Sequence, residues 1–388
     1  MAQSMNRRAW LKATSLLTGG LAVLPGQWNN LVAAPAAPNL PYQSMNDFDF
    51  GETVRPKLKA RLFANENPFG PSEKAKQAII ESLGSSYQYP MSSGEELAEK
   101  IVAFEGLKPE MLMMSAGSSA ILAAAAIYFS KDGGNIVTGD PTYDDLPDRA
   151  QQIKAKWIKV PLTTAFTLDL DAMEKAVDAN TKLVYICNPN NPTGTIVDTQ
   201  KLKSFCERVS KKTTVFVDEA YIDYLPDPRA SSMMDCVKQG HNVIVARTFS
   251  KLYGFAGLRV GYAVLPPDLA TKIEPYFSGL WSMSGPAIQA ALASYQDSEF
   301  LEGVLKKTMA SKEFLYEVLK KEGYTYIPSS TNFVMFPINM PGKRFAAELM
   351  KRGVGLRHWE FSNKNWCRIS IGRMDEMQAF AEAFKEIS

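Results

Sequence analysis

Hydrophobic positions follow two different periods along the chain from about residue 76 onward. Apolar residues at helical spacing predict helices over residues 72–83, 94–104, 118–129, 171–177 and 198–210. Short runs that are apolar throughout predict strands over residues 135–138, 157–160, 183–187, 214–217, 242–246 and 260–264. Strands of this kind, separated by helices, indicate an α/β fold with a mostly parallel sheet covered by helices on both faces.

The pattern changes near residue 286. A long helical pattern runs from 286 to 322, and predicted strands (332–336, 366–371) and helices (343–352, 375–387) follow it. This order indicates a second, smaller α+β domain. We therefore expect a large domain at 76–283, a small C-terminal domain at 284–388 and, at 37–75, an N-terminal arm or part of the small domain.

The first 36 residues have the composition of a targeting segment. Arg7 and Arg8 precede a weakly apolar stretch at 13–25, and Ala34-Pro35-Ala36 fits a small-x-small cleavage site. This order is that of a secretory signal, and the arginine pair resembles a twin-arginine signal. We expect export by the twin-arginine route to the periplasm; the alternative is a cytoplasmic enzyme with a basic tail. The apolar stretch is too short for stable membrane anchoring.

Charge and histidine content argue against two classes of function. The chain carries 43 Lys and Arg against 41 Asp and Glu, and its net charge of +2 is too small to indicate a nucleic-acid-binding surface. It has only two histidines, His241 and His358, and no group of His and Cys residues has the spacing of a zinc site. We therefore expect neither a nucleic-acid partner nor a metal.

Polar and conformationally special residues follow three consecutive predicted strands. A Pro- and Gly-containing turn follows residue 187, an acidic segment follows residue 217, and a Ser-Lys segment with a later Gly-Leu-Arg follows residue 246. Turns, helix caps or solvated surface explain each segment alone. Ligands of α/β sheets bind at the carboxyl ends of the strands, so the joint occurrence of these segments predicts a ligand site.

The segments resemble the motifs of class I/II aminotransferases of fold type I, which use pyridoxal 5′-phosphate (PLP). The resemblance is closest to the histidinol-phosphate aminotransferase branch and covers about residues 60–388. It rests on Asn65-Glu66-Asn67-Pro68-Phe69-Gly70-Pro71, Tyr89-Pro90, Asn191-Pro192-Thr193-Gly194, Asp218-Glu219-Ala220-Tyr221, Thr248-Phe249-Ser250-Lys251, Ala256-Gly257-Leu258-Arg259 and Arg368. It implies transfer of an amino group between an amino acid, or a histidinol-phosphate-like amine, and a 2-oxo acid such as 2-oxoglutarate.

The resemblance assigns roles around the cofactor ring. Lys251 is the lysine that forms the Schiff base with the cofactor aldehyde and later moves a proton as general base and acid. Asp218 keeps the pyridine nitrogen protonated by charge pairing. Tyr221 and Asn191 donate hydrogen bonds to the 3′ oxygen of the cofactor, and Tyr143 stacks on its ring.

The cofactor phosphate needs an anion site. A helix N-terminus supplies free N–H groups and a favourable dipole, and the predicted helix at 118–129 begins with Gly117, Ser118 and Ser119. The remaining phosphate ligands implied by the resemblance are Thr248, Ser250 and Arg259. Tyr89 resembles a residue that reaches the phosphate of the neighbouring subunit, which implies a homodimer with shared active sites.

Two arginines are candidate substrate ligands, and Asn191 is a third candidate. Arg368 resembles the arginine that binds the substrate α-carboxylate by two parallel hydrogen bonds. Arg357 resembles an arginine that binds a phosphorylated side chain, but His358 and Trp359 follow it and alter the expected pocket. The amino donor therefore stays open, with glutamate and aromatic amino acids among the options.

Two other functions fit the same motifs. A lyase of this fold, such as an amino-acid phosphate decarboxylase, shares nearly every motif, and its reaction products alone distinguish it from an aminotransferase. A non-catalytic PLP-binding module is disfavoured because Lys251, Asp218, Tyr221 and Arg368 are all present.

Overall fold

The computed structural model describes residues 58–387, which lie in one compact unit. The predicted targeting segment at 1–36 and the part of the arm that ends at residue 57 lie outside the described residues. Within residues 58–387, no helix is both long and apolar enough to cross a lipid bilayer.

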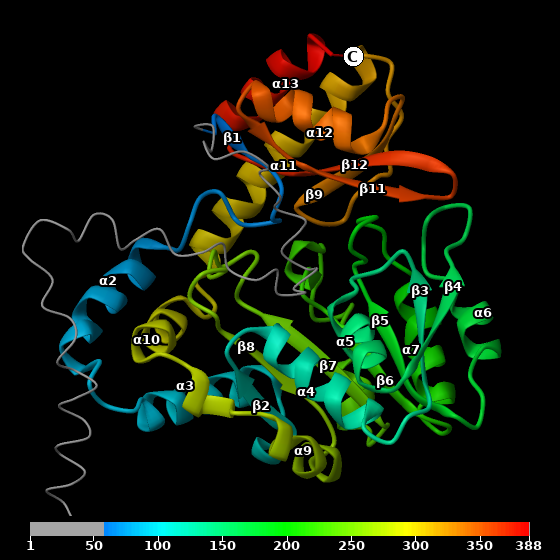
Figure 1. Ribbon diagram of the computed structural model, residues 1–388. Helices are drawn as coiled ribbons and strands as arrows, with labels where there is room; N and C mark the ends of the chain where they lie inside the picture. The colour runs from blue at the N-terminus through cyan, green and yellow to red at the C-terminus, as the bar shows by residue number, and fades with distance from the viewer. Residues whose placement is uncertain (1–57, 388) are drawn as a thin grey trace, which may run out of the picture. The chain divides into compact units, whose positions relative to one another are not determined.

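A seven-stranded sheet forms the larger part of the fold (Figure 1). Its order is β2-β8-β7-β6-β5-β3-β4, and only β8 runs antiparallel to its neighbours β2 and β7. The strands are β2 (Leu112–Ser115), β3 (Asn135–Asp140), β4 (Lys156–Pro161), β5 (Thr181–Cys187), β6 (Thr214–Asp218), β7 (Val243–Thr248) and β8 (Gly261–Val264). The mostly parallel sheet confirms the predicted α/β class.

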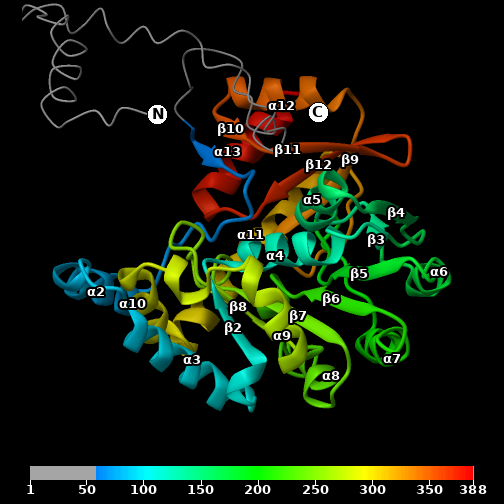
Figure 2. The ribbon, with the colours of Figure 1, turned by 60° about the horizontal axis from the view of Figure 1, so that its bottom comes forward.

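Alternate residues of each central strand point to opposite faces of the sheet, as the pleat requires. In β5, Tyr185 and Cys187 pack in one core with α4 (Ser118–Ser130), α5 (Asp145–Ile153) and α9 (Pro267–Ile273). Val184 and Ile186 pack in the other core, with α3 (Met91–Glu105), α6 (Leu170–Lys175), α7 (Thr199–Val209), α8 (Met234–Lys238) and α10 (Gly285–Ser294). Figure 2 shows α4 on one face and α7 and α8 on the other.

A three-stranded antiparallel sheet forms the smaller part. Its order is β11-β12-β9, from Arg357–Phe361, Lys364–Ser370 and Phe333–Ile338. It packs with α11 (Ser298–Lys321), α12 (Gly342–Lys351) and α13 (Met374–Lys385) around a separate core. β1 (Ala60–Arg61) joins this part by pairing in parallel with β10 (Val354–Gly355), beside α13 (Figure 1).

The helical pattern predicted from 286 to 322 is two helices. Gln296 adopts a left-handed backbone with φ of 66°, and the chain leaves α10 there before α11 begins at Ser298. α10 packs against α2 (Glu73–Ser82) and α3 in a core of the large sheet, although it follows the boundary expected at residue 283. A helical period does not reveal which core its apolar face joins. The division into domains stays a prediction.

Candidate active site

Asp218 is the last residue of β6 and is 2% exposed. Its Oδ2 accepts a hydrogen bond from the hydroxyl of Tyr185 at 3.0 Å, and its Oδ1 accepts one from the backbone N–H of Ala220 at 3.1 Å. Burial raises the pKa of Asp218 to about 6, while these two hydrogen bonds and the charge of Lys251 act in the opposite direction. The sheet therefore presents a buried carboxylate that a cationic group can hold in its ionised form.

Lys251 is close enough to Asp218 to stabilise its charge, and Tyr221 lies close to Lys251. The Nζ of Lys251 is 5.3 Å from the centroid of the Tyr221 ring. The Tyr221 hydroxyl accepts a hydrogen bond from Asn65 Nδ2 at 3.0 Å, and its ring packs edge-on against Phe333. The structure thus brings together the predicted amine, carboxylate and phenol, and their individual roles stay predictions.

Tyr143 follows β3 and belongs to the same group. Its phenol pKa is raised, first by burial and then by the negative charges of Asp145 and Asp218 and by Tyr221. Tyr143 is therefore close enough to Asp218 and Tyr221 to interact with them electrostatically, and the resemblance assigns it the stacking ring. That role stays a prediction.

Three segments form a cradle at the N-terminus of α4. Arg259 donates hydrogen bonds to Ser250 Oγ at 3.2 Å and to Ser119 Oγ at 3.4 Å, and Thr248 Oγ1 donates one to Ser250 Oγ at 2.9 Å. Gly117 has a φ of 75°, and a Cβ there would lie 2.3 Å from an Arg259 nitrogen. Hydroxyls, a guanidinium and a helix N-terminus together suit a phosphate dianion.

Arg368, on β12, is 2% exposed. It donates hydrogen bonds to Asn191 Oδ1 and to the carbonyl of Phe63, but its Nε is buried without a hydrogen-bond partner in the described part of the chain. Burial and the nearby charge of Arg357 lower the pKa of Arg368 to about 9. A buried cation without a carboxylate partner favours binding of an anion.

Arg357 lies opposite Arg368 in the pairing of β11 with β12. The guanidinium carbons of Arg357 and Arg368 lie 4.9 Å and 4.6 Å from the centroid of the same Trp359 ring, respectively. His358 lies against the start of α12 instead. Its Nδ1 is so close to Gly342 that a Cβ added at that glycine would lie 2.6 Å from it. Trp359, rather than His358, is therefore the residue that accompanies both arginines.

Tyr89 does not join the cradle through any described contact. Its side chain is 76% exposed, and its ring packs edge-on against Trp281 at a centroid distance of 5.4 Å. Its predicted contact with the phosphate of a neighbouring subunit stays a prediction.

The structure adds Tyr185, Asn65 and the Phe63 carbonyl to the predicted set. Asn65 belongs to one of the sequence motifs, which assigns it no role, and a backbone carbonyl such as that of Phe63 leaves no signal in the sequence. Tyr185 has a signal that sequence analysis missed: it is a tyrosine within an apolar strand, and a buried tyrosine hydroxyl usually has a hydrogen-bond partner.

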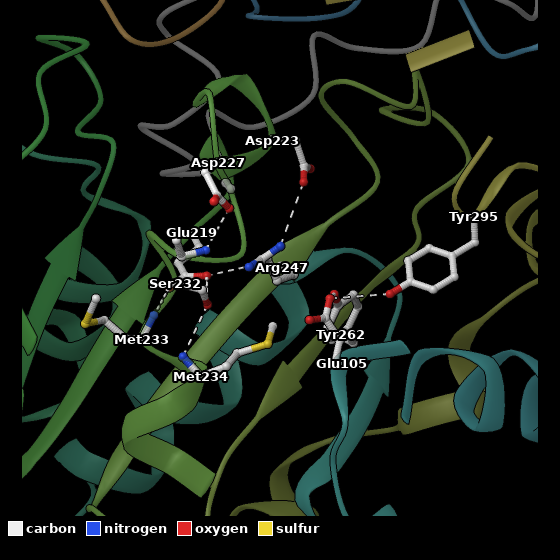
Figure 3. Close-up of polar contacts among 12 residues, drawn as sticks. Glu105, Glu219, Asp223, Asp227, Ser232, Met233, Met234, Arg247, Tyr262 and Tyr295 are labelled. Atoms are coloured by element: carbon white, nitrogen blue, oxygen red, sulfur yellow. Dashed lines mark hydrogen bonds and ion pairs between the residues drawn. The ribbon is translucent and has the colours of Figure 1, made fainter. Parts of the chain in front are cut away.

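A buried ionic network lies on the opposite face of β6 and β7 (Figure 3). Glu219 Oε2 accepts a hydrogen bond from Arg247 Nε at 2.8 Å, and Asp223 lies 3.8 Å from the same guanidinium. Because side chains alternate along each strand, Glu219 and Arg247 point away from Asp218 and Thr248. The network therefore connects the ends of β6 and β7 on the face of the sheet away from Asp218, outside the candidate active site.

The residues present fit the cofactor that the sequence motifs imply. The cradle suits its phosphate, the buried Asp218 suits a protonated ring nitrogen, and Lys251 offers a primary amine to its aldehyde. The buried Nε of Arg368, which has no hydrogen-bond partner among the described residues, would suit an anion.

Comparisons with known proteins agree with this geometry. Residues 58–384 match the family described as Aminotransferase class I and II. A histidinol-phosphate aminotransferase of Moorella thermoacetica is 35% identical over 333 residues, which are 84% of this chain and 85% of that protein. A solved protein of Erwinia carotovora atroseptica is 32% identical with a TM-score of 0.80, and the match covers 86% of this chain and 98% of that one.

The fold is also that of a PLP complex. The histidinol-phosphate aminotransferase of Sinorhizobium meliloti, solved with pyridoxal-5′-phosphate, superposes with a TM-score of 0.79 at 24% identity, over 95% of this chain and 100% of that one. Together with the family match, the carboxylate, the amine and the phosphate cradle lead to one conclusion. The chain belongs to the class I and II aminotransferase family and is a PLP-dependent aminotransferase.

Proposed function

We propose that this aminotransferase works with a 2-oxo acid that carries a second anionic group, such as 2-oxoglutarate, and with an amino donor that is an amino acid or a histidinol-phosphate-like amine. The arrangement of Arg357 and Arg368 around Trp359 carries the proposal. Two guanidinium groups beside one ring create a field that favours a substrate with two negative groups.

The chain's own residues have separate tasks in this reaction. Bound PLP supplies an electron sink for the charge that develops on the substrate Cα. Asp218 would hold the proton on the ring nitrogen, and Tyr221, which accepts a hydrogen bond from Asn65, would donate one to the 3′ oxygen. The amine of Lys251 would take the proton from the substrate Cα and return it as general acid. Arg368 holds the α-carboxylate while this transfer takes place.

Substrate selection follows from the second arginine. Glutamate and 2-oxoglutarate place one carboxylate on each arginine. Histidinol phosphate lacks a carboxylate, so its phosphate needs only one of them. The relatives named for that substrate support its inclusion among the donors.

Replacing Arg357 with alanine tests the proposal. The substitution removes one charge-assisted contact, so kcat/KM for glutamate should fall about ten- to hundredfold more than that for a neutral aromatic amino acid. Conversion of bound PLP to its pyridoxamine form measures transamination, and carbon dioxide release, followed in parallel, measures lyase activity. Arg344→Ala, an exposed arginine of α12, is the matched control. Equal losses for both substrates would show that Arg357 does not select by charge.

We also infer a homodimer with shared active sites. Tyr89 and Trp281 form an exposed aromatic pair, and they are 76% and 63% exposed. Exposed aromatic surface of this kind often marks a protein–protein contact.

Subunit mixing tests the shared sites. Lys251→Ala and Tyr89→Ala subunits should each be impaired alone, because each lacks one contributor to every site. A mixed dimer contains one intact site, so random mixing should restore about a quarter of wild-type activity. Light scattering checks the dimer mass. Failure of mixing to restore activity, or a fully active monomer, would contradict the inference.

We further propose export by the twin-arginine route. Arg7 and Arg8 and the small residues at 34–36 support it. Lys at both arginine positions should leave a folded enzyme in the cytoplasm, as cell fractionation would show. An unchanged location would favour a basic tail.

A further inference from the structure

The hydrogen bond from Tyr185 to Asp218 has not been given a role in the reaction so far. Tyr185 is fully buried on β5, and its hydroxyl donates to Asp218 Oδ2 at 3.0 Å. The backbone N–H of Ala220 donates to Oδ1 at 3.1 Å. Each carboxylate oxygen therefore has one fixed donor, and each keeps a lone pair for another partner.

Strand register creates this contact. Cys187 pairs with Asp218, and Tyr185 pairs with Phe216, so all four side chains lie on the α4 face of the sheet. Tyr185 reaches diagonally across to the carboxylate. A phenylalanine in this position would fill nearly the same space, so packing alone does not require the hydroxyl.

We propose that Tyr185 is a positioning residue that keeps Asp218 ionised and fixes the plane of its carboxylate for the cofactor ring nitrogen. A hydrogen bond to the charged form of an acid stabilises that form. Burial works against the charge of Asp218, and Tyr185 is the side-chain donor that offsets it. The inference holds for any amino donor, so it does not depend on the substrate proposal.

Other groups that face Asp218 act in both directions. The charge of Lys251 stabilises the carboxylate, whereas the charge of Asp145 on α5 destabilises it. Tyr143 and Cys187 also lie close enough to interact, and their pKa values are raised mainly by burial. All of these groups remain in a Tyr185→Phe variant, so the variant isolates one hydroxyl.

The pKa of Asp218 in the apoprotein is the direct measure. Carbon-13 NMR of carboxyl-labelled aspartate, assigned with Asp218→Asn, should place it near 6 in the wild type. Tyr185→Phe should raise it by about one unit, because the ionised form loses a donor. Tyr262→Phe is the matched control: its buried hydroxyl donates to Glu105 on the opposite face (Figure 3) and should leave Asp218 unchanged.

A substitution with the opposite effect keeps the test decisive if Tyr185→Phe folds poorly. Site-specific 3-fluorotyrosine at position 185 makes the phenol a stronger donor and should lower the Asp218 pKa. In the holoenzyme, Tyr185→Phe should lower kcat about tenfold and leave KM within about twofold, because the ring-nitrogen pair acts in the chemical step. An unchanged Asp218 pKa with either substitution, or equal shifts in the Tyr185 and Tyr262 variants, would overturn the proposal.

Discussion

Replacing Lys251 with alanine is expected to lower transamination by at least about 10⁴-fold, because one side chain supplies both the covalent link to the cofactor and the proton transfer. The amine lies beside the Tyr221 ring and acts on the charge of Asp218, so it is placed for both tasks. Single-turnover conversion of bound PLP measures the loss. Borohydride reduction of the wild-type holoenzyme, followed by peptide mapping, should place the cofactor on Lys251.

Lys312 provides a demanding control for this assignment. It is buried on α11, and burial lowers its pKa to about 8, which increases the neutral, nucleophilic fraction of its amine. Its amine, however, donates hydrogen bonds to the carbonyls of Ser329 and Thr331. Geometry therefore predicts no label on Lys312, and a label there or on any other lysine would remove Lys251 from the mechanism.

Asp218→Asn is expected to retain the cofactor and to lose turnover on the order of 10²–10³-fold. The amide keeps the shape of the side chain but carries no charge to hold the ring-nitrogen proton. Steady-state kcat and cofactor titration measure the two effects. Asp223→Asn is the matched control, because Asp223 is another acid whose pKa burial raises to about 6, but it faces Arg247 on the other side of the sheet. Equal losses in the two variants would contradict the assigned role.

Asp218→Asn should also change how the unfolding free energy of the apoprotein depends on pH. The folded-state pKa of Asp218, about 6, lies above its ordinary value of 3.8. The folded state therefore binds more protons between these values, and the contribution of Asp218 to stability decreases as pH rises through this window. Relative to the wild type, the unfolding free energy of Asp218→Asn should therefore rise by about 2 kcal/mol between pH 4 and pH 6. Denaturant unfolding at both pH values measures the change.

Strand-end position was sufficient to predict where Asp218 and Lys251 lie. Each follows an apolar run, and parallel strands bring such ends to one edge of the sheet. The bond from Tyr185 to Asp218 could not be predicted, because it depends on the register between β5 and β6, which the apolar pattern of doubly buried strands leaves open.

The arrangement of Arg357 and Arg368 shows the same limit more strongly. β11 was not predicted, so the pairing that sets Arg357 opposite Arg368 was unknown. The direction of His358 also follows from that strand, since alternate residues face opposite ways. Sequence resemblance identified the arginines, but only the fold showed that both lie near Trp359.

The attachment of β1 to the C-terminal part has a consequence for the order of folding. Asn65, which orients Tyr221, bonds through its backbone N–H to Ser370, 305 residues along the chain, and Leu62 accepts from the same residue. During synthesis, this part of the site cannot form until Ser370 has left the ribosome. Contacts of such sequence separation form slowly, so the large sheet should be able to assemble well before the enzyme becomes active.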